Sequence, residues 1–285
     1  MDPQLGLHVS IAGSLDLAVD RAAEVGATTF QMFTRNPNQW RFSPIPDETV
    51  SLFREKRVSA GFRRVVDHMP YLPNLASSDP GIKKASRQTL GEEVKRCDNL
   101  GVDYLVIHLG SHLGAGTVVG VRNISEAVNG AIAGSSGESS VLLENMAGQR
   151  NCVGARFEEL RMILDRVRRD DRVGVCLDTC HAYAAGFDLV GEAAVQSTMG
   201  LFDDCVGYDR LKVVHLNDSK GALGSNLDRH ENVGEGKIGV KGMKAILRYR
   251  GIVERPLIME TPFADTAEMK GSLAVVRRLI GRGST

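Results

Sequence analysis

Eight short apolar runs alternate with segments of helical periodicity along the 285 residues of this chain. The runs are almost continuously apolar, which is typical of parallel strands that are covered by helices. The expected strands span residues 5–10, 28–34, 63–68, 104–110, 140–145, 173–179, 211–218 and 256–261. Between them, helical spacing is clearest over 15–26 and 156–167. Eight such units predict an α/β fold, a single (β/α)8 TIM-barrel domain over residues 1–285.

Composition is that of a soluble globular protein, with 42% hydrophobic and 25% charged residues. No apolar run approaches the roughly 18 residues that a membrane-spanning helix needs. The first ten residues contain no basic segment followed by an apolar one, so no secretory signal is indicated. Five scattered cysteines, an odd number, favour reduced thiols. We therefore expect a cytoplasmic protein with no membrane partner.

Histidines and carboxylates cluster where the predicted strands end. In TIM barrels the chemistry lies at the C-terminal ends of the strands and in the loops that follow them. A single histidine there is more often a core residue than a ligand, but an ionised carboxylate after an apolar strand is costly unless it is paired or metal-bound. Nine positions together predict a metal centre: His68, His108, Glu144, Asp178, His181, His215, Asp228, His230 and Glu260.

The residue types narrow the choice of metal. Imidazole and carboxylate ligands without thiolates favour Zn²⁺, Mn²⁺ or Fe²⁺ over Ca²⁺ or Mg²⁺. At about four ligands per zinc, counting bridges and an open water position, nine ligands suffice for three ions. Asp228 and His230 lie two residues apart in a polar loop, so both side chains can reach one ion. We expect His8 to lie in the core or behind a ligand, and His112 to orient a ligand or contact a phosphate.

Three stretches resemble the endonuclease IV family of zinc-dependent abasic-site endonucleases. They are H-M-P-Y-L-P-N-L-A from His68, G-V-C-L-D-T-C-H-A from Gly174, and H-L-N-D-S-K-G-A-L-G-S-N-L-D-R-H from His215. The resemblance covers essentially the whole chain. It implies that one zinc is held by His68 and His108, with Glu144 bridging to a second zinc. The second site is completed by Asp178, His215 and Glu260, and a third ion is held by His181, Asp228 and His230.

The resemblance also implies the reaction. The phosphodiester 5′ to an abasic site in duplex DNA is hydrolysed, leaving a 3′-hydroxyl and a 5′-deoxyribose phosphate, and a 3′-phosphodiesterase side activity is also expected. A hydroxide between two ions is the expected nucleophile, since a metal lowers the pKa of bound water to about 7. Glu144, Asp178 and Glu260 are then the catalytic carboxylates. Three ions would add positive charge to a chain whose formal net charge is zero. We expect a monomer without an organic cofactor.

Two loops carry residues suited to reading the lesion, since an enzyme acting on an abasic sugar has to extrude it and fill the gap. The expected DNA contacts are Arg35, Asn38, Gln39, Tyr71, Leu72 and His112. The alternative for these loops is an ordinary surface turn. Asn38 stands where the family often has an inserting arginine, and it lacks that reach and charge. Arg35, Arg41 or Leu72 would then take over the insertion.

Other interpretations are open at this point. A xylose-isomerase-like sugar isomerase or epimerase also gathers histidines and carboxylates at this rim, but needs one or two ions and no Asp228/His230 site. A non-catalytic module that binds damaged DNA would not need a complete ligand set. Covalent catalysis by Cys180 beside His181 is disfavoured, because neighbouring residues usually point apart. The G-E-G-K-I-G of residues 234–239 does not directly follow a strand, so it indicates a turn or a phosphate contact rather than a dinucleotide site.

Overall fold

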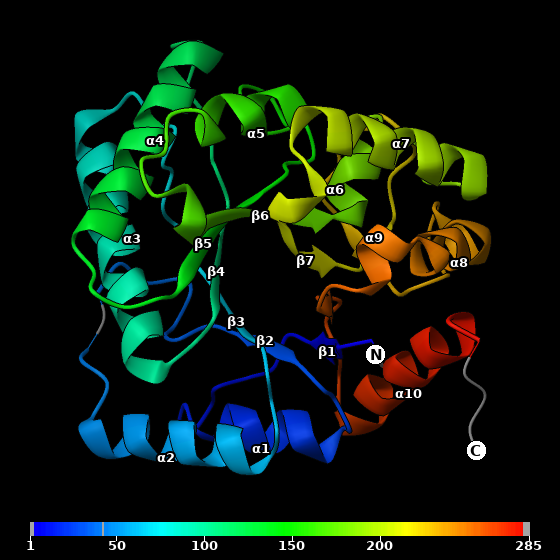
Figure 1. Ribbon diagram of the computed structural model, residues 1–285, viewed down its shortest axis with the longest axis horizontal. Helices are drawn as coiled ribbons and strands as arrows, with labels where there is room; N and C mark the ends of the chain where they lie inside the picture. The colour runs from blue at the N-terminus through cyan, green and yellow to red at the C-terminus, as the bar shows by residue number, and fades with distance from the viewer. Residues whose placement is uncertain (1–2, 42, 282–285) are drawn as a thin grey trace.

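The computed structural model describes residues 3–41 and 43–281, and helices surround a barrel of parallel strands in it (Figure 1). Each of the eight strands lies within its predicted range, so the predicted (β/α)8 class is confirmed. Their bounds are β1 Leu5–Leu7, β2 Phe30–Met32, β3 Val65–His68, β4 Tyr104–Ile107, β5 Ser140–Glu144, β6 Val173–Asp178, β7 Leu211–His215 and β10 Leu257–Met259.

The strands are neighbours in the order β1-β10-β7-β6-β5-β4-β3-β2, and every paired neighbour is parallel. A parallel bridge between His8 and Gln31 joins the two outermost strands of this order. The N–H of Val9 also donates to the carbonyl of Gln31, at 2.7 Å. The sheet thus closes on itself just beyond the short β1 and β2.

A helix follows each strand, and together the helices form the outer ring in Figure 1. Local signals set their ends: α3 begins at Pro80, where the Asp79 carboxylate accepts from the N–H of Ile82, and ends before Gly101 at φ 69°. No helix among the described residues is long and apolar enough to cross a bilayer. The helices are α1 Leu17–Glu24, α2 Asp47–Ser59, α3 Pro80–Leu100, α4 Thr117–Ala133, α5 Phe157–Leu164, α6 Thr179–Ala184, α7 Glu192–Cys205, α8 Gly239–Arg248, α9 Arg250–Val253 and α10 Thr266–Leu279.

Apolar side chains form two separate cores. The larger one lies between the strands and the helices and includes Phe30, Phe53, Phe157 and Phe202. The smaller one fills the barrel, where alternate strand residues point inward, and consists of Val66, Val106, Leu142, Cys176, Val213 and Ile258. All five cysteines are free, as expected.

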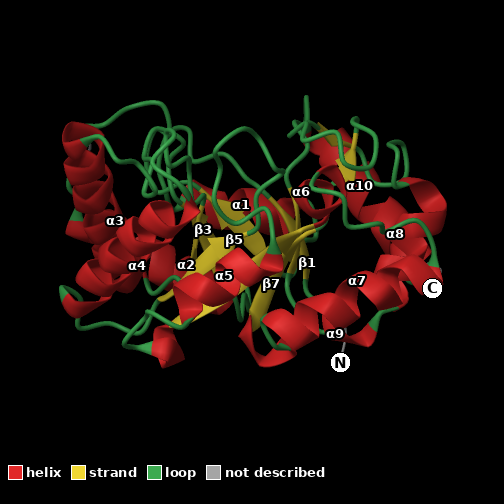
Figure 2. Cartoon of the chain, turned by 90° about the horizontal axis from the view of Figure 1, so that it is seen from above, coloured by secondary structure: helices red, strands yellow, loops and turns green. Residues whose placement is uncertain are grey.

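Long loops gather at one edge of the barrel, above the strands in Figure 2. The 215–230 stretch forms one of them. Its two ends pair as a short antiparallel hairpin of β8 (Asp218–Ser219) and β9 (His230–Glu231). The stretch therefore leaves the barrel at His215 and returns His230 to the same rim.

Candidate metal centre

Each of the six residues that fill the barrel is followed, two positions later, by a predicted metal ligand. Because side chains alternate along a strand, these ligands point into the barrel one layer nearer the C-terminal ends. The pairs are Val66 with His68, Val106 with His108, Leu142 with Glu144, Cys176 with Asp178, Val213 with His215, and Ile258 with Glu260. The apolar layer thus forms the floor of a polar mouth.

Eight of the nine predicted ligands form three overlapping groups in the described part of the chain. Within each group the ligand atoms lie within 4.8 Å of one another. The groups are His68–His108–Glu144, Glu144–Asp178–His215–Glu260, and Asp178–His181–His230. The ninth, Asp228, lies beside the third group, with Oδ1 at 3.1 Å from Nε2 of His181. The division matches the one implied by the family resemblance, with Asp178 added to the third group.

Glu144 links the first group to the second. Its Oε2 lies 3.1 Å from Nε2 of His108 and 3.3 Å from Nε2 of His68, while Oε1 lies 2.9 Å from Nδ1 of His215. Burial alone would raise the pKa of Glu144, but His108 and His215 hold it well below its usual range. The carboxylate is therefore ionised, with one oxygen facing each group.

Asp178 links the second group to the third, and it does so at the turn from β6 into α6. Its Oδ1 accepts from the N–H of His181 at 2.7 Å and so caps the helix. Its Oδ2 lies 3.6 Å from Nε2 of His230 and 3.8 Å from Nδ1 of His215. One short D-T-C-H segment thus fixes a carboxylate and an imidazole together.

Backbone carbonyls orient two of the imidazoles. Nδ1 of His68 lies 2.8 Å from the carbonyl of Met69, and Nδ1 of His181 lies 2.9 Å from the carbonyl of Asn145. Since a carbonyl only accepts, each Nδ1 carries a proton and each Nε2 is turned to the mouth, as in metal-binding histidines.

Two buried nitrogens show that a cation suits the third group. Among the described residues Nε2 of His230 has no hydrogen-bond partner, and Nε2 of His181 has none but the Asp228 carboxylate, at 3.1 Å. Burial opposes protonation of His181, yet Asp178 foremost, with Asp228 and Glu144, raises its pKa to about 10. This pocket therefore strongly favours positive charge, and its donor set suits a metal ion.

Thiols take no part in these groups. Burial raises the pKa values of Cys176 and Cys180 to about 12, so both remain protonated at neutral pH. The sulfur of Cys180 faces the carbonyl of Arg229 at 3.6 Å. The arrangement supports the expectation that Cys180 is not a nucleophile.

Three buried amides, which the sequence-based selection missed, hold the ligands in place. Asn217 donates to Oδ2 of Asp178 at 2.7 Å and to Oε2 of Glu260 at 3.0 Å. Asn145 accepts from the N–H of Asp178 at 2.7 Å. Gln31 contacts Glu260 and His215. A signal existed for two of them: Gln31 is a polar residue in β2, and Asn217 continues the inward-facing period two residues beyond the end of β7.

The backbone N–H groups of the G-E-G-K-I-G turn are already bound by a side chain of the protein itself. The carboxylate of Asp218 accepts from the N–H groups of Gly234, Ile238 and Gly239, each at 3.0 Å. This negative charge takes the backbone donors that a phosphate would need, which favours the turn over the phosphate contact. It also ties the start of α8 to the β8–β9 hairpin that carries His230.

The β2–α2 loop exposes some of its predicted DNA contacts and buries another. Asn38 and Gln39 are exposed, as is Trp40. Arg35 is 7% exposed; its guanidinium pairs with the buried Glu93 and donates to the carbonyl of Gln39 at 3.0 Å. In this conformation Arg35 shapes the loop from behind, so its direct contact with DNA stays a prediction.

The β3–α3 and β4–α4 loops bring the other predicted contacts to the rim. Tyr71 is 57% and Leu72 38% exposed. The Tyr71 ring lies 6.0 Å from that of His68 and 6.1 Å from that of His108, centre to centre. Nδ1 of His112 accepts from the N–H groups of Gly114 and Gly116. His112 therefore carries its proton on Nε2, the atom that can donate to a phosphate.

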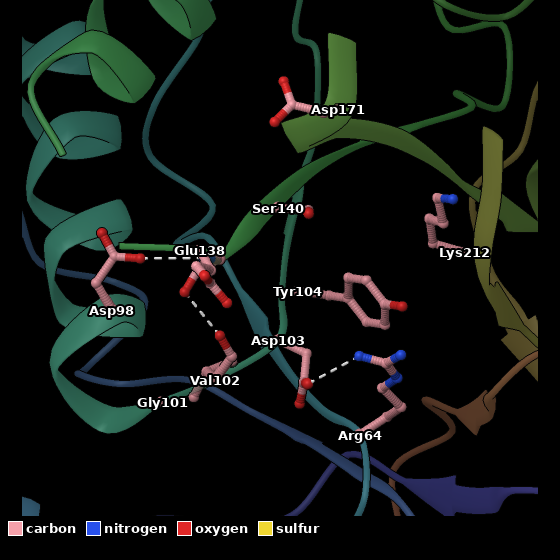
Figure 3. Close-up of a pocket in the computed structure, with 11 residues that line it drawn as sticks. Arg64, Asp98, Gly101, Val102, Asp103, Tyr104, Glu138, Ser140, Asp171 and Lys212 are labelled. Carbon is pink, nitrogen blue, oxygen red and sulfur yellow. Dashed lines mark hydrogen bonds and ion pairs between the residues drawn. The ribbon is translucent and has the colours of Figure 1, made fainter. Parts of the chain in front are cut away.

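The opposite end of the barrel has a different character (Figure 3). A pocket there is lined by residues at the N-terminal ends of the strands, including Tyr104, Ser140 and Lys212. Arg64 pairs with Asp103 at 3.1 Å and lies over the Tyr104 ring. Arg64 is thus paired within this pocket, whereas the carboxylates of the C-terminal mouth converge with histidines.

Residues 19–279 match a family described as xylose isomerase-like TIM barrels. The chain is 47% identical to a probable endonuclease 4 of Methanoculleus marisnigri over 97% of this chain and 99% of that protein. It is 45% identical to a probable endonuclease 4 of Cenarchaeum symbiosum, over 98% and 100% of the respective chains.

Solved structures also resemble this chain over nearly its whole length. The crystal structure of endonuclease IV from Thermus thermophilus superimposes with a TM-score of 0.88 at 35% identity, over 99% of this chain and 100% of that one. A D-tagatose 3-epimerase-like protein superimposes with a TM-score of 0.68 at 20% identity, covering 98% of both chains. The second likeness concerns the barrel fold alone.

Proposed function

The chain belongs to the endonuclease IV family, and we propose that it is a DNA-repair endonuclease that hydrolyses the phosphodiester 5′ to an abasic site in duplex DNA. The products are a 3′-hydroxyl and a 5′-deoxyribose phosphate. The observation that carries the proposal is the third donor group: His181, Asp228 and His230 converge beside a two-group centre of the kind that a sugar isomerase would use.

Three Zn²⁺ ions suit these groups, with Mn²⁺ or Fe²⁺ as replacements in one or more sites. His68, His108 and Glu144 would hold the first ion, and Glu144, Asp178, His215 and Glu260 the second. His181, Asp228 and His230 would hold the third, next to Asp178. Such ions supply a water-derived nucleophile at neutral pH and neutralise phosphoryl and leaving-group charge.

The protein's own residues set the geometry of this centre. Glu144 presents one oxygen to each of the first two groups, and Asp178 places Oδ2 between His215 and His230, so these two carboxylates fix the spacing between neighbouring groups. Asn217 bridges Asp178 and Glu260, which keeps these two carboxylates in place. Glu144, Asp178 and Glu260 are the proposed catalytic carboxylates. The same open mouth would admit a 3′-blocked end, so a 3′-phosphodiesterase side activity is part of the proposal.

The rim loops would bind the duplex. Asn38, Gln39, Tyr71, Leu72 and His112 offer polar and apolar groups around the mouth, and Arg35 supports them from behind. Because contacts with the phosphate backbone of DNA are electrostatic, binding to DNA should weaken as salt is added. We propose that the enzyme acts as a monomer and without an organic cofactor.

Incubating the purified protein with a duplex containing one abasic analogue, with and without a chelator, tests this function. Incision 5′ to the analogue, its loss with the chelator and its return with Zn²⁺ are the expected results, together with about three ions per chain. Intact DNA after metal is restored would refute the nuclease. One or two ions and turnover of a ketose would favour a sugar epimerase.

Asp228→Asn is the sharpest variant for the third site, since this side chain lies on a loop and is one-third exposed. Losing the anionic ligand should reduce the bound metal from about three ions to about two while the barrel stays folded. Asp188→Asn, in an exposed turn, is the matched control. Three retained ions in Asp228→Asn would contradict the assigned third site.

A further inference from the structure

Gln31 is a fully buried amide whose side chain lies inside the barrel beside the second donor group. Its Nε2 lies 2.6 Å from Oε1 of Glu260 and 3.1 Å from Nδ1 of His8. Its Oε1 lies 2.8 Å from Nε2 of His215. The oxygen and both amide hydrogens are therefore engaged, and the backbone pairing of β2 with β3 fixes where the amide sits.

Chemistry allows only one orientation of this amide. The Glu260 carboxylate can only accept, so the group at 2.6 Å from it has to be the NH₂ of Gln31. The second hydrogen goes to Nδ1 of His8, whose ring is neutral because burial lowers the pKa of His8 to about 4. The carbonyl oxygen of Gln31 is then left facing His215, whose Nε2 has to be the donor.

His215 therefore keeps its proton on Nε2, and Nδ1 is the nitrogen left for a metal ion, which would replace the proton that Nδ1 shares with its carboxylate neighbours. That atom lies 2.9 Å from Oε1 of Glu144 and 3.0 Å from Oε2 of Glu260, at the centre of the second donor group. We propose that Gln31 is a positioning residue, which sets the tautomer of His215 and the direction of the Glu260 carboxylate for binding a metal ion. The inference rests on the metal centre of the proposed function.

The variant Gln31→Met distinguishes a role of the Gln31 amide in orienting His215 and Glu260 from a role of its side chain in filling space. Methionine keeps the length and most of the volume but neither accepts from Nε2 of His215 nor donates to Glu260. Loss of such outer contacts typically costs about 10- to 100-fold in metal affinity. We expect the affinity of the tightest His215-containing site for Zn²⁺ to fall by that factor, measured by competition with a chromophoric chelator on the full chain.

The second readout is the ring proton itself. In the Zn²⁺-loaded protein labelled with ¹⁵N-histidine, His215 should show an Nε2–H proton protected from exchange. That proton should exchange rapidly in Gln31→Met. Gln31→Glu keeps an acceptor and loses the donors, so it should retain the protected proton while binding Zn²⁺ more weakly, which a structural role alone would not produce.

Asn123→Ala is the control, because Asn123 is another buried amide, remote from the centre, that bonds to the carbonyl of Ser77. It should lose stability without losing Zn²⁺ affinity. Wild-type affinity and a protected proton in Gln31→Met would overturn the role of Gln31 while leaving the metal centre intact. A wild-type protein that binds no Zn²⁺ through His215 would overturn the proposed centre, and this inference with it.

Discussion

Leu72 stands out among single residues because it is an apolar side chain left 38% exposed beside a mouth of charged groups. Its neighbour Tyr71 is held over His68 and His108, so Leu72 follows a fixed aromatic and projects from a short Pro-bounded loop. Apolar wedges of this kind enter duplexes where a base step is opened. A site with a missing base offers such an opening.

Leu72→Ala should weaken binding to abasic duplex more than binding to undamaged duplex. Burying a leucine stabilises by about 1.5–3 kcal/mol, so the loss on abasic DNA should be roughly tenfold or more. Titration of both duplexes by fluorescence anisotropy measures it. Leu201→Ala, an exposed leucine of α7, is the matched control. Equal losses on the two duplexes would rule out the wedge.

The carboxylate of Asp218 helps to tie the β8–β9 hairpin to the start of α8. Asp218 serves three backbone N–H groups at the entry to α8, and an asparagine at this position has only one acceptor oxygen. Each backbone donor left unpaired in the interior costs about 1–3 kcal/mol. The hairpin also carries His230, so its order and the third donor group are linked.

Asp218→Asn should therefore destabilise the protein by about 1–3 kcal/mol and selectively empty the third site. Denaturant unfolding and metal analysis after dialysis at limiting Zn²⁺ check the two effects. Asp188→Asn, whose side chain accepts from one N–H in an exposed turn, should show neither. A normal metal count with reduced stability would separate the hairpin from the metal centre.

Helices α1 and α2 are joined by an ion pair with a defined pH dependence. Lys56 on α2 lies 2.7 Å from Oδ2 of Asp16, at the start of α1. The hydrogen bonds from Lys56 and Ser14 lower the pKa of Asp16. A lowered carboxyl pKa stabilises the fold above the unfolded value of about 3.9, and this stability is lost as the pH falls through the native pKa.

Asp16→Asn should accordingly be less stable than the wild type at pH 7, and the difference should shrink as the pH falls below the unfolded value of about 3.9. Urea unfolding across this pH range measures it. In a Lys56→Met background the Asp16→Asn effect should largely disappear, because the partner is gone. A difference that persists unchanged into acid would show that the ion pair is not its source.

The barrel as a whole was predictable because its parallel strands appear in the sequence as continuous apolar runs, and amphipathic helical segments separate these runs. The convergence of the proposed metal ligands was predictable because strand ends meet at one end of a barrel, so that His68 and Glu260, distant in sequence, share one mouth. The burial of Arg35 was not predictable, since it depends on Glu93 of α3, and no local pattern indicates that pairing. The roles of Gln31 and Asn217 likewise arise only from contacts across the barrel.

At the scale of the whole molecule, four carboxylates converge at one end of the barrel, and we expect the stability of the protein to depend on metal for this reason. Ions that bind only the folded chain stabilise it by RT ln(1 + [metal]/Kd), which is about 2.7 kcal/mol at 100 times Kd. For a protein of 285 residues that corresponds to a rise in Tm of about 5 °C. Chelation should lower the Tm by this amount, and Zn²⁺, but not Mg²⁺, should restore it, as followed by calorimetry. An unchanged Tm after verified removal of metal would show that the mouth is stable without cations.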